Sequence, residues 1–366
     1  MNKKQNGTIL SSIIVSALLL GCGTSLSSPT VSTAGKVVDD YIKGAKVCAD
    51  VNENGKADDG DANCVITDSN GAFNFGRRVT ASLVMSGGVD IGTNKPFTGT
   101  FLAPAESKVI NPLTTIVSSI QKTGKSVEEA QDIVKDKLGL PDVDLTTFDP
   151  LSEVVYGTDN AAKEDAKKVL AQQSNIQVVL TVVATTIASA STNVHERDVT
   201  EQASNQIAAL MLAANTNSSA VNVASQASVG TILSGTATTV LAAEPTAIAQ
   251  VQAVTTVVSQ QTEAVSSAVV SNVEAISVNS AETGADAIAE ANAALLLVTD
   301  QDNANSVSNL IEEAVTTGST TDLGNVNVNA EIQNSQSALP ERPKTPETTE
   351  SSNSAVTPTT GGSGGN

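Results

Sequence analysis

Residues 111–141 read NPLTTIVSSIQKTGKSVEEAQDIVKDKLGLP, and they mark the change from strands to helices along this chain. Asn111 is a favourable N-cap and Pro112 suits the first helical position, so a helix is predicted to begin here. Ser126 and Glu129 have the spacing of a capping box, which predicts the start of a second helix. The apolar positions of the two segments recur at helical spacing at Leu113, Ile116, Val117 and Ile120, and at Ile133, Val134 and Leu138.

The chain before this stretch has the patterns of strands. Val79–Met85 (VTASLVM) is rich in β-branched and apolar residues and is followed by two glycines. The turn sequence Asp68–Gly71 precedes Ala72–Phe75, in which apolar and polar residues alternate as in a half-buried strand. Residues 36–105, called the β module below, are therefore predicted to form a small N-terminal β-sandwich.

The chain after this stretch is predicted to be helical up to residue 315. Asp149 and Pro150 have the pattern of another helix start. From Asp159 onward the residues are mainly Ala, Val, Ser, Thr, Asn and Gln, and their spacing favours helices. A seam in steps of four and three runs through Ala247, Val251, Val254, Val258, Gln261, Val265, Ala268, Asn272 and Ala275. This pattern is typical of a helical bundle or of a coiled-coil-like region.

The predicted fold class is α+β, with five segments. They are a signal peptide at residues 1–21, a tether at 22–35, the β module at 36–105, a helical region at 106–315 and a disordered tail at 316–366.

The N-terminus has the features of an export signal. Lys3 and Lys4 precede Ile9–Leu20, an apolar run that is too short to cross a bilayer, which needs roughly 20 residues. The sequence Leu19-Leu20-Gly21-Cys22 then resembles the lipobox of bacterial lipoproteins. The resemblance implies that Cys22 carries a diacylglycerol and acyl lipid, such as palmitate, which anchors the chain to a membrane. The alternative is an ordinary signal peptide with an incidental cysteine.

The resemblance also implies a place in the bacterial cell envelope. Gly23 follows the cysteine, where an Asp often marks retention at the inner membrane, so the outer membrane is favoured, on its periplasmic or its surface face. The net charge of −19 argues against nucleic-acid partners, whose binding depends on neutralising phosphates with Lys and Arg. A surface protein or matrix component is the expected kind of partner.

The cysteines leave one pair once Cys22 is assigned to lipid. Cys48 and Cys64 could form a disulfide or remain two free buried thiols, and export to an oxidising compartment favours the disulfide. The loop between them has about 15 residues, for which a cross-link is worth roughly 3 kcal/mol.

The loop between these cysteines resembles a calcium-binding loop. Residues 50–61 read DVNENGKADDGD, with glycine at loop position 6, where a sharp turn is needed. Ca²⁺ prefers six to eight hard oxygen ligands, which alternate short acidic and amide side chains can supply. The predicted ligands, including the backbone carbonyl of the lysine, are Asp50, Asn52, Asn54, Lys56, Asp58 and Asp61. The loop is similar to those of EF-hands and, with Asp at position 12, to those of dockerins.

The sequence around the loop departs from both families, because neither flank has the pattern of a helix. The arrangement is more similar to calcium loops in the SdrD B-like, or prealbumin-like, β-sandwich repeats of bacterial surface proteins. In those repeats such a loop precedes a hairpin like Thr67–Phe73 (TDSNGAF) here. The alternative is an acidic turn that binds no metal.

Other motifs give little support for catalysis. His195 lies in a polar stretch between predicted helices, which favours a surface position. Gly361–Gly365 matches G-x-S-x-G but lacks the strand and helix that a nucleophile elbow requires. The leading hypothesis is a non-enzymatic envelope lipoprotein with a structural, adhesive or docking role, stabilised by Ca²⁺. The alternatives are a dockerin-like calcium-dependent docking module and a hydrolase whose carboxylates the sequence does not pair.

Overall fold

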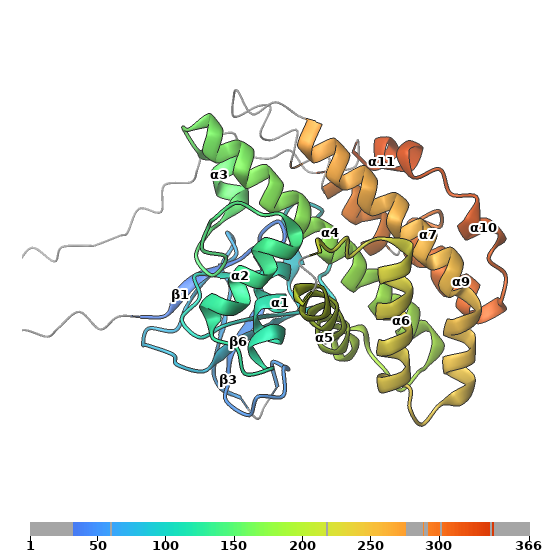
Figure 1. The fold of residues 1–366 in the computed structure, drawn as a ribbon, viewed down its shortest axis with the longest axis horizontal. Coiled ribbons are helices and arrows are strands. Elements are labelled where there is room, and N and C mark those ends of the chain that lie inside the picture. Colours follow the sequence, from blue (N-terminus) through green and yellow to red (C-terminus); the bar gives the residue numbers. More distant parts are fainter. Residues whose placement is uncertain are drawn as a thin grey trace, which may run out of the picture. The chain divides into compact units, whose positions relative to one another are not determined.

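The computed structural model describes residues 32–58, 61–216, 219–275, 288, 292–300, 302–336 and 339. The predicted signal peptide, Cys22 and the motif at residues 361–365 lie outside the described residues. Strands occupy the N-terminal part of the described chain and helices follow them (Figure 1). The predicted α+β class is confirmed.

The strands form three small sheets. A three-stranded sheet has the order β5-β1-β9, in which β1 pairs antiparallel with β5 and parallel with β9. A four-stranded antiparallel sheet has the order β4-β3-β6-β8, and β2 pairs with β7. The strands are β1 (Ala34–Val37), β2 (Ile42–Lys43), β3 (Lys46–Asp50), β4 (Ala62–Ile66), β5 (Ala72–Asn74), β6 (Ser82–Ser86), β7 (Val89–Asp90), β8 (Thr100–Ala103) and β9 (Val109–Ile110).

The two larger sheets share one hydrophobic core. Val37, Phe73 and Ile110 from the three-stranded sheet belong to the same buried cluster as Leu83 and Phe101 from the four-stranded sheet. Strand β5 alternates between buried and exposed side chains, as the sequence predicted. The other face of the four-stranded sheet is buried too, at Cys48, Val84 and Leu102. Such burial is what stabilises strands this short.

The first helices begin where the sequence predicted. In α1 (Pro112–Gln121) and α2 (Val127–Leu138), the side chains of Asn111 and Ser126 accept hydrogen bonds from the backbone N–H three residues on. Helix α3 (Pro150–Tyr156) begins after Asp149, which caps the N–H of Ser152 at 3.0 Å. These caps satisfy N–H groups that have no partner within the helix.

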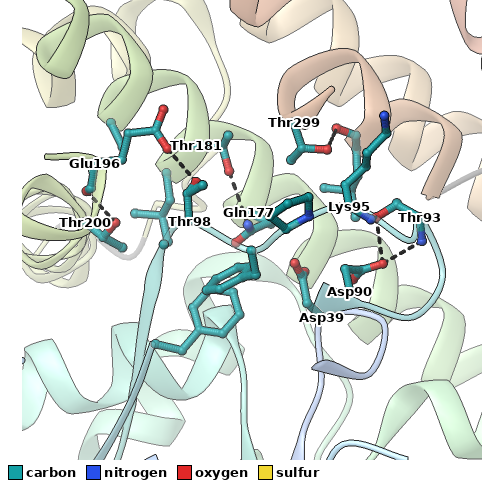
Figure 2. Close-up of a pocket in the computed structure, with 17 residues that line it drawn as sticks. Asp39, Asp90, Thr93, Lys95, Thr98, Gln177, Thr181, Glu196, Thr200 and Thr299 are labelled. Atoms are coloured by element: carbon teal, nitrogen blue, oxygen red, sulfur yellow. Dashed lines mark hydrogen bonds between the residues drawn. The ribbon is translucent and has the colours of Figure 1, made fainter. Parts of the chain in front are cut away.

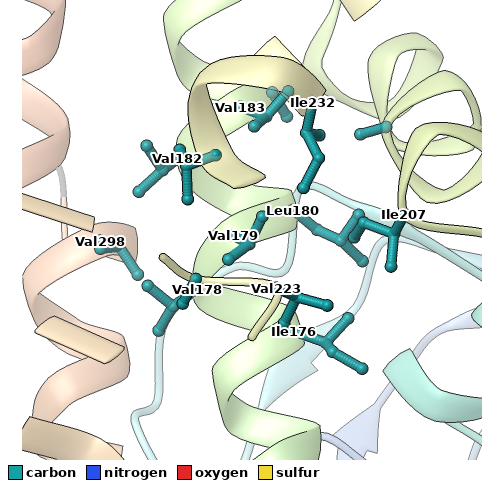
Figure 3. Close-up of a cluster of buried hydrophobic side chains, with 14 of the residues drawn as sticks. Ile176, Val178, Val179, Leu180, Val182, Val183, Ile207, Val223, Ile232 and Val298 are labelled. Carbon is teal, nitrogen blue, oxygen red and sulfur yellow. The ribbon is translucent and has the colours of Figure 1, made fainter. Parts of the chain in front are cut away.

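The longest helices form the main core. Helix α4 (Asn160–Ala190) packs against α5 (Glu196–Asn215), α7 (Pro245–Ala275) and α9 (Val307–Thr317), while α6 (Gln226–Val240) packs on α5 and α7 (Figure 1). The stretch from Ile176 to Val183 in α4 is apolar over much of its circumference, and its apolar side chains all belong to this cluster. Figure 3 shows these side chains meeting Ile207 of α5, Ile232 of α6 and Val298.

Helix α7 (Pro245–Ala275) contains the predicted seam, but its buried face differs from that seam in the last turns. Val269 and Val273 are fully buried, whereas Ala268 and Asn272 are half-buried. The buried positions after Val265 follow steps of four, which suits a straight helix with 3.6 residues per turn better than a supercoil with 3.5.

The helical region continues past residue 315, where the sequence predicted the disordered tail to begin. Helices α10 (Thr321–Gly324) and α11 (Val328–Gln336) both pack on α7. Leu323, Val328 and Ile332 are buried there, so this stretch has enough apolar side chains to join the core. The remainder of the predicted tail, from residue 340, lies outside the described residues.

The β module and the helices are joined by a further buried cluster. Val38 and Tyr41 pack with Leu151 of α3 and Leu170 of α4. The Tyr41 hydroxyl donates to Asp149 at 2.8 Å, on the carboxylate that also caps α3. The described residues from Ser32 onward accordingly form one unit by their contacts, which contains both the β module and the helices.

Candidate functional site

The predicted calcium loop connects β3 to β4, so strands flank it on both sides, as the sequence indicated. Cys48 in β3 and Cys64 in β4 form a disulfide, which confirms the predicted pair and closes the base of the loop. The loop residues 50–58 and 61 are described, and residues 59–60 are not.

Asp50, at loop position 1, is buried and organises the turn. Its carboxylate accepts the backbone N–H groups of Asn54 and Gly55, each at 3.1 Å. Gly55 has φ +69°, in the left-handed region that glycine adopts without strain. The sharp turn that the sequence predicted at loop position 6 is therefore present.

The other predicted side chains lie around the same turn. Asn52 and Asn54 donate their amide N–H groups to the two carboxylate oxygens of Asp58, at 3.4 and 2.7 Å. The Asp58 backbone N–H donates to Asp61 at 3.4 Å. Hydrogen bonds thus link loop positions 3 and 5 to position 9, and position 9 to position 12. Lys56, at position 7, lies on the same turn.

One carboxylate oxygen in the loop, Oδ1 of Asp61, is buried without a hydrogen-bond partner. Burial raises the pKa of Asp50 above its ordinary value, and the negative charge of Asp61 raises it further. Burial likewise raises the pKa of Asp61, with a contribution from Asp58. A cation placed among these oxygens would relieve both the burial cost and the repulsion.

One side of the loop rests on helix α5. The Lys56 ammonium pairs with Asp198 at 3.0 Å, and Gly55 lies against the side chain of Glu201. Glu201 in turn pairs with Lys122 at the end of α1, at 2.5 Å. The loop therefore links the β module to the start of the helical region.

A second group of candidate side chains, around a pocket, was not predicted from the sequence. Asp39 and Asp90 are both buried and line a pocket that Gln177 of α4 and Glu196 of α5 also line (Figure 2). Burial raises the pKa of Asp39, and the charge of Asp90 adds to this; burial also raises the pKa of Asp90, to about 6. The sequence did contain a signal for the burial of Asp39, because Asp39 and Asp40 stand inside the otherwise apolar run Val37–Ile42 (VVDDYI).

His195 is exposed at the residue before α5, and its side chain makes no capping hydrogen bond. Over the described residues, no three His, Cys, Asp or Glu side chains are close enough together to hold a metal ion by themselves. A search of the same residues for membrane-spanning helices found none with sufficient length and hydropathy.

Comparisons with protein-family models, with curated proteins and with solved structures found no match to this chain.

Proposed function

We propose that the chain is a calcium-stabilised envelope lipoprotein with a structural, adhesive or partner-docking role, and that it is not an enzyme. The observation that carries the proposal is the loop at residues 50–61. Six oxygen-bearing positions with calcium-loop spacing lie on one turn between two strands, and the disulfide closes the base of that turn.

Calcium would be held by the carboxylates of Asp50, Asp58 and Asp61, the amide oxygens of Asn52 and Asn54, and the backbone carbonyl of Lys56. The buried Oδ1 of Asp61, which has no partner, supports this assignment. The two Asn side chains now direct amide N–H groups at Asp58, so they would rotate to present oxygen instead.

Stabilisation is the role that the loop's surroundings favour. Gly55 and Lys56 already contact α5, so one face of the loop is covered by the chain itself. A dockerin-like module would instead present the loop to another protein. Bound Ca²⁺ would then fix the turn against α5 and hold the β module to the helices.

A thermal melt tests the calcium assignment. The full chain, purified in detergent, would be melted with CaCl₂, with MgCl₂ and with a chelator. A ligand at about 100 times its dissociation constant adds about 2.7 kcal/mol to the free energy of unfolding. The melting temperature should rise with Ca²⁺ more than with Mg²⁺, and Asp50→Ala should abolish the rise.

Two further variants make this test specific. Asp61→Asn should weaken the calcium response while preserving a side chain of the same shape in the loop. Asp132→Asn, at an exposed position in α2, should respond to Ca²⁺ as the unaltered chain does. An equal melting temperature with Ca²⁺ and with chelator would show that the loop is an acidic turn that binds no calcium.

The membrane anchor has its own test. Cells would be given labelled palmitate, and the chain would be recovered from the membrane fraction. Label should enter the unaltered chain and be lost with Cys22→Ser, which should also release the protein from membranes. Label retained by Cys22→Ser would refute the lipoprotein assignment and leave the calcium assignment standing.

A further inference from the structure

A pocket lies between the β module and the helices, and none of the predicted calcium ligands lines it (Figure 2). Its cavity volume is about 30 Å³, so the enclosed part admits only a small chemical group. In Figure 2, Asp39 and Asp90 lie together on one side of the view and Glu196 of α5 lies on the other. Gln177 of α4 lies between them, and Phe97 is a further lining residue. A neighbouring hollow shares Glu196 with it and extends to Asp302, whose side chain is largely exposed.

Two hydrogen-bond acceptors in this pocket have no partner. Oδ1 of Asp39 and Oε1 of Gln177 are both buried and accept no hydrogen bond. Asp39 is 6% exposed and Gln177 is 4% exposed, so neither oxygen is well solvated. Buried polar atoms in folded proteins are almost always paired, and an unpaired acceptor facing a cavity indicates a missing donor.

The neighbouring carboxylate, Asp90, has a structural role instead. Its Oδ1 accepts from the backbone N–H of Thr93 at 2.7 Å and from the Thr93 hydroxyl at 2.9 Å. Its Oδ2 accepts from the backbone N–H of Asp40 at 3.2 Å. Asp90 therefore shapes the wall, and Asp39 is the carboxylate left to bind a ligand.

The charge around the pocket favours a cation. Three acidic residues line it, namely Asp39, Asp90 and Glu196. Lys95 is the only basic residue among the described lining residues. The Lys95 ammonium pairs with Asp300 at 2.8 Å and with Asp302 at 3.0 Å, so its charge is already neutralised. Burial raises the pKa of both Asp39 and Asp90, as expected for carboxylates without a counter-charge.

The remaining lining favours an organic cation over a metal ion. Phe97 and Phe101 line the pocket with ring centroids 4.8 Å apart, and Leu180 and Leu295 line it as well. Aromatic faces attract ammonium groups, whereas Ca²⁺ and Mg²⁺ require a shell made of oxygen atoms. Unpaired acceptors also call for a cation that carries N–H donors, which a quaternary ammonium lacks.

We propose that this pocket binds the ammonium group of a small primary amine, with Asp39 Oδ1 and Gln177 Oε1 accepting its N–H donors and Phe97 and Phe101 flanking it. The apolar part of the ligand lies toward Leu180 and Leu295. The pocket and the calcium loop share no residue, so variants in one site leave the side chains of the other unchanged.

Ethylammonium chloride is a suitable probe, with ethanol as a neutral molecule of similar size and tetramethylammonium as a cation without donors. Binding to the full chain, in detergent and with CaCl₂ present throughout, would be measured by ligand-observed NMR titration. Ethylammonium should bind saturably, and the other two probes at least tenfold more weakly. No saturable binding of ethylammonium, or equal binding of all three probes, would overturn the proposal.

Two variants assign the binding to the pocket. Asp39→Asn should weaken ethylammonium binding at least tenfold, and it is expected to fold because it removes a buried charge without changing shape. Gln177→Leu should weaken binding by a smaller factor. Asp142→Asn is the matched control, since the Asp142 side chain is 98% exposed, and its binding should be unchanged. Equal binding by the unaltered chain and by Asp39→Asn would exclude this pocket as the site.

Discussion

Gly55, at the turn of the candidate calcium loop, lies so close to Glu201 of α5 that a Cβ on Gly55 would be 2.7 Å from the carboxyl carbon of Glu201. The same glycine has φ +69°, so two separate constraints act on one position. Close approach and left-handed backbone both select glycine. The loop is thereby held by its own turn and by the helix beneath it.

Gly55→Ala is expected to destabilise the chain through both constraints. The left-handed conformation costs an alanine about 1–2 kcal/mol, and displacing Glu201 weakens its pairing with Lys122. Urea unfolding of Gly55→Ala, Glu201→Ala and the double variant would separate the two effects. In the Glu201→Ala background the loss should shrink to the backbone cost alone, whereas an unchanged loss would show that the contact with Glu201 is of no consequence.

The disulfide between Cys48 and Cys64 is expected to contribute substantially to stability. The two cysteines are 16 residues apart in the sequence. For a loop of this length, the chain-entropy model gives a cross-link about 3 kcal/mol of the free energy of unfolding. Unfolding in urea should therefore occur at lower concentration for the Cys48→Ala/Cys64→Ala variant. Adding a reductant should lower the midpoint of the unaltered chain and leave that of the double variant unchanged. A midpoint insensitive to both changes would contradict this expectation.

The last turns of α7 offer a test of helix register. Val269 is fully buried, so Val269→Ala should cost about 2 kcal/mol through lost burial and a small cavity. Ala268→Ser, on the seam predicted from sequence and only half-buried, should change the free energy of unfolding by much less. The two variants would be compared by urea unfolding under the same conditions. A larger loss for Ala268→Ser than for Val269→Ala would support the heptad seam instead.

Features set by neighbouring residues could be predicted from the sequence. The caps at Asn111 and Ser126 are local hydrogen bonds, and the turn at Gly55 depends on one residue's backbone freedom. The disulfide followed from the number of cysteines and the inferred compartment. Such features are decided within a few residues, or by a count, and do not depend on the tertiary arrangement.

Features set by the tertiary arrangement could not be predicted in the same way. The choice of Val269 over Ala268 depends on which helices surround α7, and a seam of small residues fits either register. Asp39 of the β module and Gln177 of α4 line the same pocket, and no local sequence pattern pairs them. Helices α10 and α11 were missed because their polar composition outweighs the few apolar residues that pack on α7.

The buried carboxylates also predict an unusual response to pH. Asp39 ionises near its ordinary pKa of 3.8 in the unfolded chain, whereas burial raises its pKa in the folded chain. Folding at neutral pH must therefore protonate this group or bury its charge, and either lowers the free energy of unfolding. The penalty is absent below the unfolded pKa and grows as the pH rises. For Asp90, whose folded pKa is about 6, the same linkage amounts to roughly 3 kcal/mol at pH 7.

Asp39→Asn should accordingly raise the free energy of unfolding at pH 7, and the gain should shrink as the pH falls toward 4. The charged groups that line the same pocket are Asp90, Lys95 and Glu196, and all three are retained in the variant. Carboxylates with lowered pKa, such as Glu129 and Asp142, lose stabilisation in acid. That loss occurs equally in the unaltered chain and in Asp39→Asn. The quantity to measure is therefore the difference between their free energies of unfolding in urea at each pH. A difference that stays constant from pH 7 to pH 4 would show that Asp39 is not penalised by its burial.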